Sequence, residues 1–230
     1  DSIWVQAVDG ESQTPLDELA TEISETVGIR LEYEQPYDWI CFVPRREKSI
    51  GALTKYFGKV RDTDEYKIRG IEIRQRSTPP FIKSIQHDLM DVLDRHREPE
   101  PVCDRLQVHL SRLRAGDVNL QELIFRKRVS KRLEEYTQGT HTVSALMRYR
   151  DHGIKKNPGQ DIRYVVVNDN ARQPDRVRLH FELNDEYDES VYERELTRAA
   201  ESIVSPLGWD RSDIQRYLKG TRDAAIQAYD

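Results

Sequence analysis

Apolar residues along the first part of the chain recur with two periods, one of two residues and one near 3.6. Residues 29–44 alternate as in a half-buried strand, and residues 1–8 also read as a strand; between them a helical pattern runs over residues 14–27 and ends at Gly28. Pro15 suits the first turn of that helix, where its missing N–H would have no partner. Further strand candidates follow at 53–60 and 66–76. This order predicts an α+β domain whose antiparallel sheet carries a helix on one face.

Beyond these strands the pattern becomes mainly helical. An apolar stripe at helical spacing runs from Phe81 to Leu93, after two prolines that suit a first turn. A break rich in acids and prolines at 98–101 precedes another helix through Leu113. We place a domain boundary at this break, which predicts a sheet domain over 1–98 and a second domain over 99–230.

The second domain is predicted to be helical apart from a small β element. Segments 161–168 and 176–183 read as a pair of strands. A further helical pattern over 190–208 ends at Gly208, and two shorter helices close the chain. The fold class predicted for the whole chain is therefore α+β.

Composition narrows the class of protein only a little. The 230 residues carry a formal charge of −5, and 33% of them are charged. This excludes a histone-like polycation but not a nucleic-acid partner, because phosphate binding depends on local clusters of charge. The two cysteines lie far apart, and no apolar run approaches the roughly 20 residues of a membrane span. We expect a reduced, cytoplasmic protein with no membrane contact.

Basic residues gather in four clusters. They are Arg45, Arg46, Lys48, Lys55, Lys59 and Arg61; Lys67, Arg69, Arg74 and Arg76; Arg126, Lys127, Arg128, Lys131 and Arg132; and Arg148, Arg150, Lys155 and Lys156. A single cluster of this kind is usually a solvated face. Four clusters interleaved with Tyr56, Gly58, Gly70 and Gly153 favour a surface that follows a phosphate backbone, since glycine lets main-chain N–H groups approach phosphates closely.

Candidate catalytic motifs are few. His141 follows Gly139 and Thr140 where a helix is predicted to begin, so it could donate to a phosphate or cap the helix. The other histidines lack the spacing of a zinc site. The sequence has no Gly-x-Ser-x-Gly elbow, phosphate-binding loop or dinucleotide fingerprint, so hydrolase and nucleotide-switch functions have no support.

Read together, the segments resemble the carboxy-terminal part of a family B DNA polymerase, most like archaeal members. The matching segments are "DSIWV", "LTKYFG", "IRGIEIRQRSTPPF", "VSKRLEEYTQGTHTV", "GIKKNPGQDIRYVVV" and "YDESVYERELTRAAESIVSPLG", in the family's order. The resemblance implies the end of a palm domain, with a partial antiparallel sheet and helices, followed by a mainly helical thumb with a small β element. It also implies that the chain is a piece of a longer protein.

Asp1 is the one catalytic residue that the resemblance assigns. It matches the second aspartate of the family's motif C, usually written YGDTDS, and would be a metal ligand. The resemblance implies Mg²⁺ as the cofactor of the whole enzyme, in which two ions serve phosphoryl transfer. The partner aspartate would stand two residues earlier, so we expect the 230 residues alone to be inactive and not to retain the metal.

The other residues assigned by resemblance are DNA contacts. They are Lys55, Tyr56, Gly58, Arg69, Arg74, Arg76, Ser130, Lys131, Gly139, His141 and Lys155. Such groups would hold the backbone without reading sequence. The chain departs from the family pattern at Leu53 and Thr54, where basic residues are usual, at Ser77, where aspartate is common, and at Thr140, where proline is usual.

The implied function is deoxynucleotide addition to a primer by the whole enzyme, with primer–template DNA and deoxynucleoside triphosphates as partners and a nucleoid-associated location. The tail "GTRDAAIQAYD" lacks the leading glutamine and the second aromatic residue of a sliding-clamp peptide, which makes that partner doubtful. Two alternatives stay open: a free-standing nucleic-acid-binding module with a thumb-like fold, and a structural domain whose basic clusters are solvated faces.

Overall fold

The structure is a computed structural model, and it describes residues 3–6, 15–45 and 48–227 of the chain. Its helices are α1 (Leu16–Val27), α2 (Pro80–His96), α3 (Pro99–Arg114), α4 (His141–Asp151), α5 (Glu189–Val204) and α6 (Arg211–Gln227). Its strands are β1 (Tyr37–Arg45), β2 (Lys48–Val60), β3 (Tyr66–Arg69), β4 (Phe125–Arg128), β5 (Asp161–Val166) and β6 (Val177–Leu179). This arrangement confirms the predicted α+β class.

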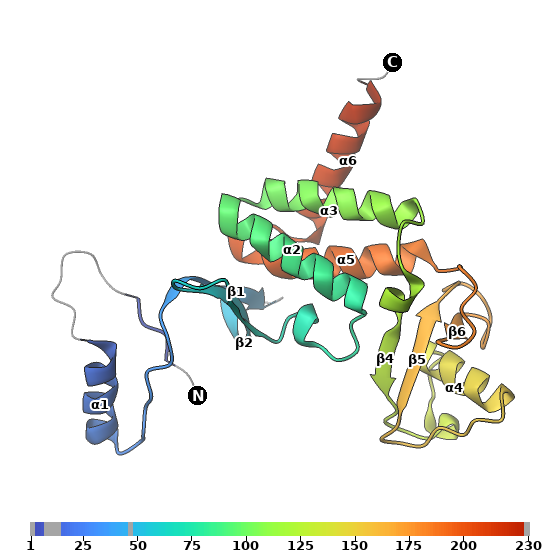
Figure 1. Cartoon of the computed structure of the whole chain (residues 1–230), viewed down its shortest axis with the longest axis horizontal. Coiled ribbons are helices and arrows are strands. Elements are labelled where there is room, and N and C mark those ends of the chain that lie inside the picture. Colours follow the sequence, from blue (N-terminus) through green and yellow to red (C-terminus); the bar gives the residue numbers. More distant parts are fainter. Residues whose placement is uncertain (1–2, 7–14, 46–47, 228–230) are drawn as a thin grey trace.

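Helices α2, α3 and α5 form the layer from which the rest of the molecule extends. Figure 1 shows the β1–β3 sheet and the β4–β6 sheet on the same side of this layer, with the segment between β3 and α2 between them. The apolar stripe of α2 is buried here as predicted, and Leu89, Leu106 and Ile203 of the three helices are 0% exposed. The core continues across residue 98, so the boundary between 1–98 and 99–230 stays a prediction.

The first sheet has the order β1-β2-β3, and both of its pairings are antiparallel. One face packs on α2 through Phe57, which is 0% exposed. At the same face Trp39 Nε1 donates to Asp94 Oδ1 at 2.7 Å, and Tyr66 Oη donates to Asp91 Oδ1 at 2.9 Å. Two hydrogen bonds to carboxylates on one helix fix the angle at which α2 crosses the strands.

The second sheet has the order β4-β5-β6 and packs against α4. Phe125 and Tyr164 lie opposite each other in the register, and their rings stack 5.7 Å apart. The Tyr192 hydroxyl of α5 donates to Leu123 O at 2.9 Å and accepts from Val166 N at 3.2 Å. This buried tyrosine therefore ties the sheet to the helical layer.

Several predicted elements are confirmed. Gly28 ends α1 in the left-handed conformation, with φ of 69°. The strand predicted at 53–60 is the second half of β2, and the predicted pair at 161–168 and 176–183 forms β5 and β6. Gly208 ends the α5 region with φ of 89°.

Other predictions about the first part of the chain are wrong. Residues 3–6, within the predicted strand 1–8, lie in no strand; instead the Trp4 ring packs on the rings of Tyr37, Phe42 and Tyr56. The predicted strand 66–76 stops at Arg69, because Gly70 has φ of 73° and turns the chain away. Among its described residues α1 buries none, so the helix that covers the sheet is α2 (Figure 1).

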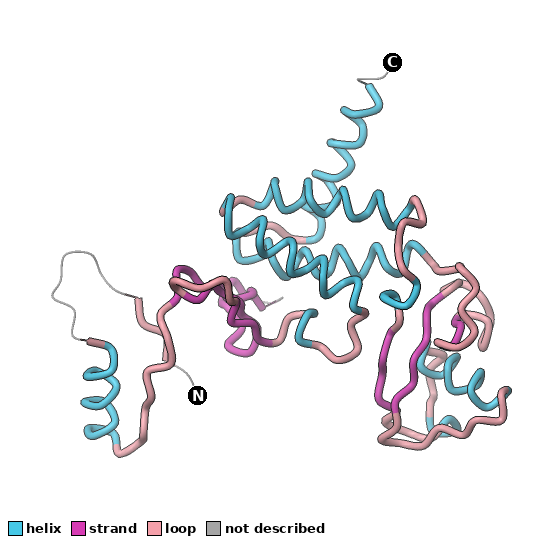
Figure 2. The backbone as a smooth tube through the Cα atoms, viewed as in Figure 1, coloured by secondary structure: helices cyan, strands magenta, loops and turns pink. Residues whose placement is uncertain are grey.

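The second part of the chain differs from prediction at two elements. Strand β4 was not predicted, since "FRKR" has too few apolar residues to show a strand pattern. The two short closing helices are one helix, α6, which extends from the globule in Figure 2. None of the helices in the described part of the chain is long and apolar enough to cross a membrane.

Candidate nucleic-acid interface

The face of the first sheet that points away from α2 carries two of the predicted DNA-binding residues, Tyr56 and Arg69. They lie opposite each other in the register and therefore share a face. Arg69 is exposed and forms no ion pair within the described residues. Tyr56 is only 3% exposed, because its ring lies between Trp4, with centroids 5.0 Å apart, and Phe42 at 5.7 Å.

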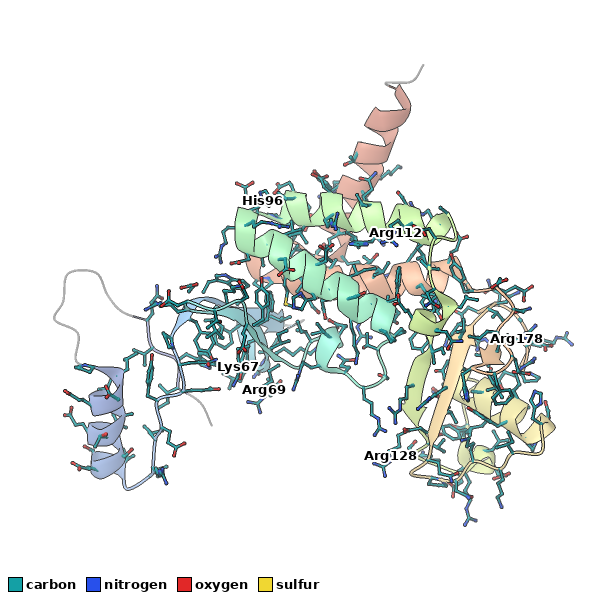
Figure 3. All side chains as sticks on the ribbon, viewed as in Figure 1. Lys67, Arg69, His96, Arg112, Arg128 and Arg178 are labelled. Carbon is teal, nitrogen blue, oxygen red and sulfur yellow. The ribbon has the colours of Figure 1, made fainter. Side chains whose placement is uncertain are left out.

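Lys67 also lies on the face of the first sheet that points away from α2, and its Nζ forms an ion pair with Glu34. The hydrogen bond to Glu34 is the main reason that the pKa of Lys67 lies above its ordinary value. Figure 3 shows Lys67, Arg69 and Arg128 on the side of the molecule away from the helical layer that carries His96 and Arg112. One side of the molecule thus gathers basic groups from both sheets.

Two glycines fix the backbone near these residues. A Cβ on Gly70 would lie 2.1 Å from Thr54 O, and a Cβ on Gly58 would lie 2.5 Å from Trp39 O. Both positions therefore need glycine for close approach of strands. Lys55 precedes Tyr56 in β2 and so projects from the opposite face of the sheet, where it is half-buried near Gly70. The structure therefore separates Lys55 from Tyr56.

A shared carboxylate joins the segment after β3 to the second sheet. Arg76 Nη2 donates to Asp161 Oδ2 at 2.7 Å, and Arg126 Nη2 lies 2.6 Å from the same oxygen. The hydrogen bond from Arg126 is the main cause that lowers the pKa of Asp161. Two guanidinium groups on one carboxylate leave a net positive charge here. Arg74, nearby, is exposed and forms no ion pair in the described part of the chain.

The part of the second sheet where the end of β4 pairs with the start of β5 continues this positive surface. Arg126 lies opposite Arg163, and Arg128 opposite Asp161, so these four side chains share the face away from Tyr164. Arg128 and Arg163 are exposed and form no ion pair among the residues described. They were not among the predicted site residues. Arg128 does belong to the basic cluster at 126–132 in the sequence, whereas Arg163 belongs to none of the four clusters.

The loops next to β4 and β5 carry three further predicted residues, all exposed: Ser130, Lys131 and Lys155. Ser130 Oγ lies 3.3 Å from the Tyr136 hydroxyl. Gly159 N donates to Val129 O at 2.8 Å, and Val129 N donates to Gln160 O at 2.8 Å, which holds the two loops together. Lys131 and Lys155 therefore lie on neighbouring loops at the end of the second sheet.

Gly139 and His141 stand at the start of α4, as predicted. His141 Nε2 donates to Asp169 Oδ1 at 2.7 Å, and Arg176 Nη1 donates to Gly139 O at 2.8 Å. Burial on its own would raise the pKa of Asp169, but hydrogen bonds from His141 and Arg176 outweigh it and hold that pKa below its ordinary value. Asp169 and Arg176 were not foreseen, because their partners lie about 30 residues away in sequence.

Asp1, the predicted catalytic residue and metal ligand, lies outside the described residues. Within the described ranges, no group of three or more His, Cys, Asp or Glu side chains is arranged to hold a metal ion. Both cysteines are free thiols.

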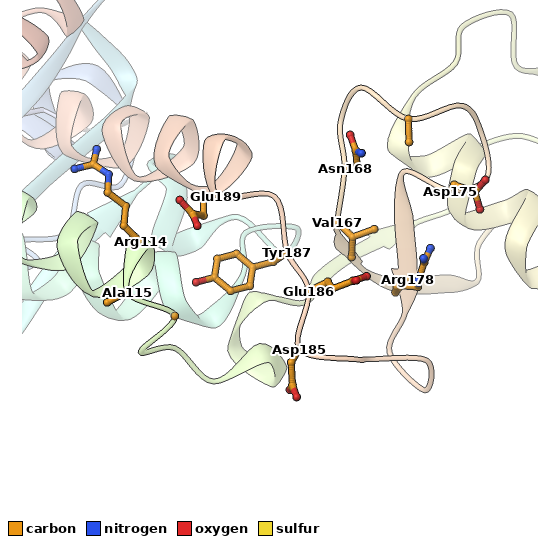
Figure 4. A pocket seen from close by; sticks show the side chains of 12 residues that line it. Arg114, Ala115, Val167, Asn168, Asp175, Arg178, Asp185, Glu186, Tyr187 and Glu189 are labelled. Atoms are coloured by element: carbon orange, nitrogen blue, oxygen red, sulfur yellow. The ribbon is translucent and has the colours of Figure 1, made fainter.

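A cleft of about 670 Å³ lies between the C-terminal end of α3 and the segments that flank β6. Figure 4 shows Tyr187 between the end of α3 and the segment that carries Glu186 and Asp185, and the Tyr187 hydroxyl donates to Leu113 O. The lining mixes two arginines, Arg114 and Arg178, with several carboxylates, and contains none of the predicted DNA-binding residues. Its charge does not favour a phosphate ligand.

One protein-family profile covers both sheets and the basic surface that they share. It is the profile of DNA polymerase family B, and it matches residues 3–207, which is most of the chain. The chain belongs to DNA polymerase family B. This confirms the resemblance on which the site residues were assigned.

Relatives of this family B chain include archaeal DNA polymerases. It is 25% identical over 176 residues to the DNA polymerase of Archaeoglobus fulgidus, which covers 76% of the chain and 21% of that protein. It is 25% identical over 205 residues to the DNA polymerase of Thermococcus gorgonarius, covering 87% and 25%. The chain therefore spans about a fifth to a quarter of the length of these relatives.

Among solved structures, the fold is similar to the family B DNA polymerase from the hyperthermophilic archaeon Pyrobaculum calidifontis. The TM-score is 0.61 at 20% identity, and the match covers 84% of this chain and 25% of that one. At this identity the likeness concerns the fold.

Proposed function

We propose that this family B chain is the end of the palm and the thumb of a DNA-directed DNA polymerase, and that it holds the primer–template duplex. The observation that carries the proposal is the basic surface shared by the two sheets on the side away from α2 and α3. Arg69 of the first sheet and Arg128 of the second lie on this side (Figure 3), and Arg76 and Arg126 meet there on Asp161. The proposed contacts are Arg69, Arg74, Arg76, Arg126, Arg128 and Arg163, together with Ser130, Lys131, Gly139, His141 and Lys155 in the loops and at the helix start beside the second sheet. His141 lies toward the Tyr164 face of that sheet, opposite the face that carries Arg163.

The charge of this surface supports a backbone-binding role. Arg69, Arg74 and Lys131 are exposed and form no ion pair in the described residues, so they are available to neutralise phosphates. Asp161, which lies opposite Arg128 in the register of β4 and β5, is already paired with Arg76 and Arg126. A surface of this kind contacts phosphates and positions a duplex without selecting a sequence.

Catalysis is proposed only for the whole enzyme. There, Asp1 would contribute one carboxylate toward Mg²⁺, with deoxynucleoside triphosphates as substrates. For the 230 residues alone we expect no primer extension, and a measurable rate would contradict this assignment. A coding frame with Tyr-Gly-Asp-Thr just upstream of Asp1 would favour the polymerase over a free-standing binding module.

Salt dependence tests the duplex-binding role. We expect the chain to bind duplex DNA of unrelated sequences with similar affinity, measured by fluorescence anisotropy. The logarithm of the association constant should fall with the logarithm of salt concentration by about 0.9 per phosphate neutralised. Binding that is undetectable even at low salt would contradict the proposal and favour solvated basic faces.

A pair of triple variants tests which surface binds. Arg69→Ala, Arg74→Ala and Lys131→Ala together should reduce the salt slope by roughly three, at about 0.9 for each phosphate that is no longer neutralised. The control triple Arg95→Ala, Arg112→Ala and Arg216→Ala removes the same charge from exposed helical positions elsewhere. It should leave the slope nearly unchanged. Equal reductions in both triples would show that only net charge matters.

A further inference from the structure

One carboxylate between β5 and β6, Asp169, accepts hydrogen bonds from a histidine and two arginines. Asp169 Oδ1 accepts from His141 Nε2 at 2.7 Å and from Arg176 Nη2, and Asp169 Oδ2 accepts from Arg194 Nη2 at 2.8 Å. Its own backbone N donates to Asp188 Oδ2 at 2.7 Å, which ties the cluster to the N-cap of α5. We call His141, Asp169, Arg176 and Arg194 the Asp169 cluster.

The Asp169 cluster also holds the turn that precedes α4. Arg176 bridges two chain segments, since Nη1 donates to Gly139 O at 2.8 Å while Nε donates to Asp169 O at 2.8 Å. Gln173 Nε2 donates to Thr140 O at 3.5 Å, and a Cβ on Gly139 would lie 2.6 Å from that nitrogen. The backbone of Gly139 and Thr140 is therefore fixed from the segment between β5 and β6.

The same contacts orient the His141 ring. Because the carboxylate of Asp169 accepts from Nε2, the remaining ring nitrogen, Nδ1, is the one left to meet a ligand. The His141 and Asp169 side chains are each 25% exposed, so the pair lies at the surface but is not freely rotating in solvent.

From this geometry we infer that Asp169 and Arg176 are positioning residues, which hold the Gly139–His141 turn in the orientation that contacts a DNA phosphate. This rests on the proposed duplex-binding function. Neither residue needs to touch DNA. The guanidinium of Arg176 and the carboxylate of Asp169 fix the position of the turn, and the turn itself contacts the phosphate.

A positioning role and simple electrostatics predict opposite changes in DNA affinity when Asp169 loses its charge. Removing a negative charge beside a DNA-binding surface should strengthen binding if charge alone mattered. If Asp169 holds the turn, Asp169→Asn should weaken binding, although the surface becomes more positive. The two explanations therefore predict opposite changes from one substitution.

The test measures duplex affinity against salt for the unmodified chain and for three variants. At about 0.1 M salt, Asp169→Asn should bind roughly tenfold more weakly, with a salt slope lower by about one, because the turn no longer holds its phosphate. Arg176→Lys keeps its charge but lacks the planar fork, and it should be weakened to a similar extent. Asp185→Asn, an exposed carboxylate with no hydrogen bond or ion pair among the described residues, is the matched control. It should bind like the unmodified chain or slightly more tightly.

Circular dichroism and thermal unfolding accompany each measurement, so that affinity is compared only between folded proteins. If Asp169→Asn fails to fold, Arg176→Lys carries the test. Unchanged or tighter binding by folded Asp169→Asn and Arg176→Lys, with an unchanged slope, would overturn the positioning role alone. Absence of salt-dependent binding by the unmodified chain would overturn the proposed function and this inference together.

Discussion

Replacing Gln86 by leucine tests how the segment that carries Arg74 and Arg76 is held. Gln86 is 0% exposed and joins three segments. Its Oε1 accepts from Ile73 N at 2.7 Å, and its Nε2 donates to Glu72 Oε2 at 2.9 Å and to Ala199 O at 2.9 Å. Leucine has a similar size but cannot form any of these bonds.

The expected loss of stability follows from the groups left without partners. Each buried polar group deprived of its partner costs about 1–3 kcal/mol, so three groups give roughly 3–9 kcal/mol. Burying the leucine side chain offsets about 1.5–3 kcal/mol of this. Glu72, which is 2% exposed, keeps one partner, because Arg198 Nε lies 3.4 Å from its Oε1. Taking the middle of each range, about 6 less about 2, we expect a destabilisation of about 4 kcal/mol.

Urea denaturation followed by circular dichroism measures this destabilisation. Gln215→Leu, on the exposed surface of α6, is the matched control and should change the free energy of unfolding by less than about 0.5 kcal/mol. A destabilisation below about 1 kcal/mol for Gln86→Leu would refute the reasoning, since a single unsatisfied buried group should cost that much.

Three further predictions concern stability and reactivity. Burial by itself raises the pKa of Glu182, but hydrogen bonds from Arg148, Leu179 N and His152 outweigh it and hold that pKa below its ordinary 4.5. The stability this carboxylate contributes should be present above pH 4.5 and be lost as the pH falls further, and Glu182→Gln should flatten the acid limb of the unfolding free energy measured against pH. Burial raises the pKa of the Cys103 thiol to about 12, so iodoacetamide at mildly alkaline pH should label it only after denaturation; rapid labelling of the folded chain would contradict this. Gly58→Ala should destabilise the first sheet by about 1–3 kcal/mol in urea, since its Cβ meets the backbone oxygen of Trp39; Gly220→Ala in α6, with open space around it, should not.

The sequence predicted elements whose signals are local. The apolar stripe of α2, its N-terminal prolines and the glycines after α1 and α5 act over a few residues, and each of these features is present in the structure. By contrast, β4 owes its existence to hydrogen bonds with β5, about 35 residues later, and its own residues are mostly charged. Propensity within a short window carries no information about such a partner.

Within the candidate site, too, the features with local signals could be predicted and those that depend on distant segments could not. Clusters of lysine and arginine were visible in sequence, and so was the helix start at His141. The carboxylates that organise them, Asp161 and Asp169, come from distant segments and showed no local pattern. The resemblance to family B polymerases supplied the site assignment, whereas the burial of Tyr56 depends on the packing of Trp4 on the first sheet, which no local pattern indicated.

Hydrogen exchange with and without duplex DNA measures the binding surface most directly. If the basic side of the two sheets holds the duplex, DNA should slow exchange of the backbone amides over 69–76 and 128–142 and leave the amides of α3 and α6 unaffected. Protection confined to α3 and α6, with no change in those two segments, would contradict the assignment of this surface to DNA.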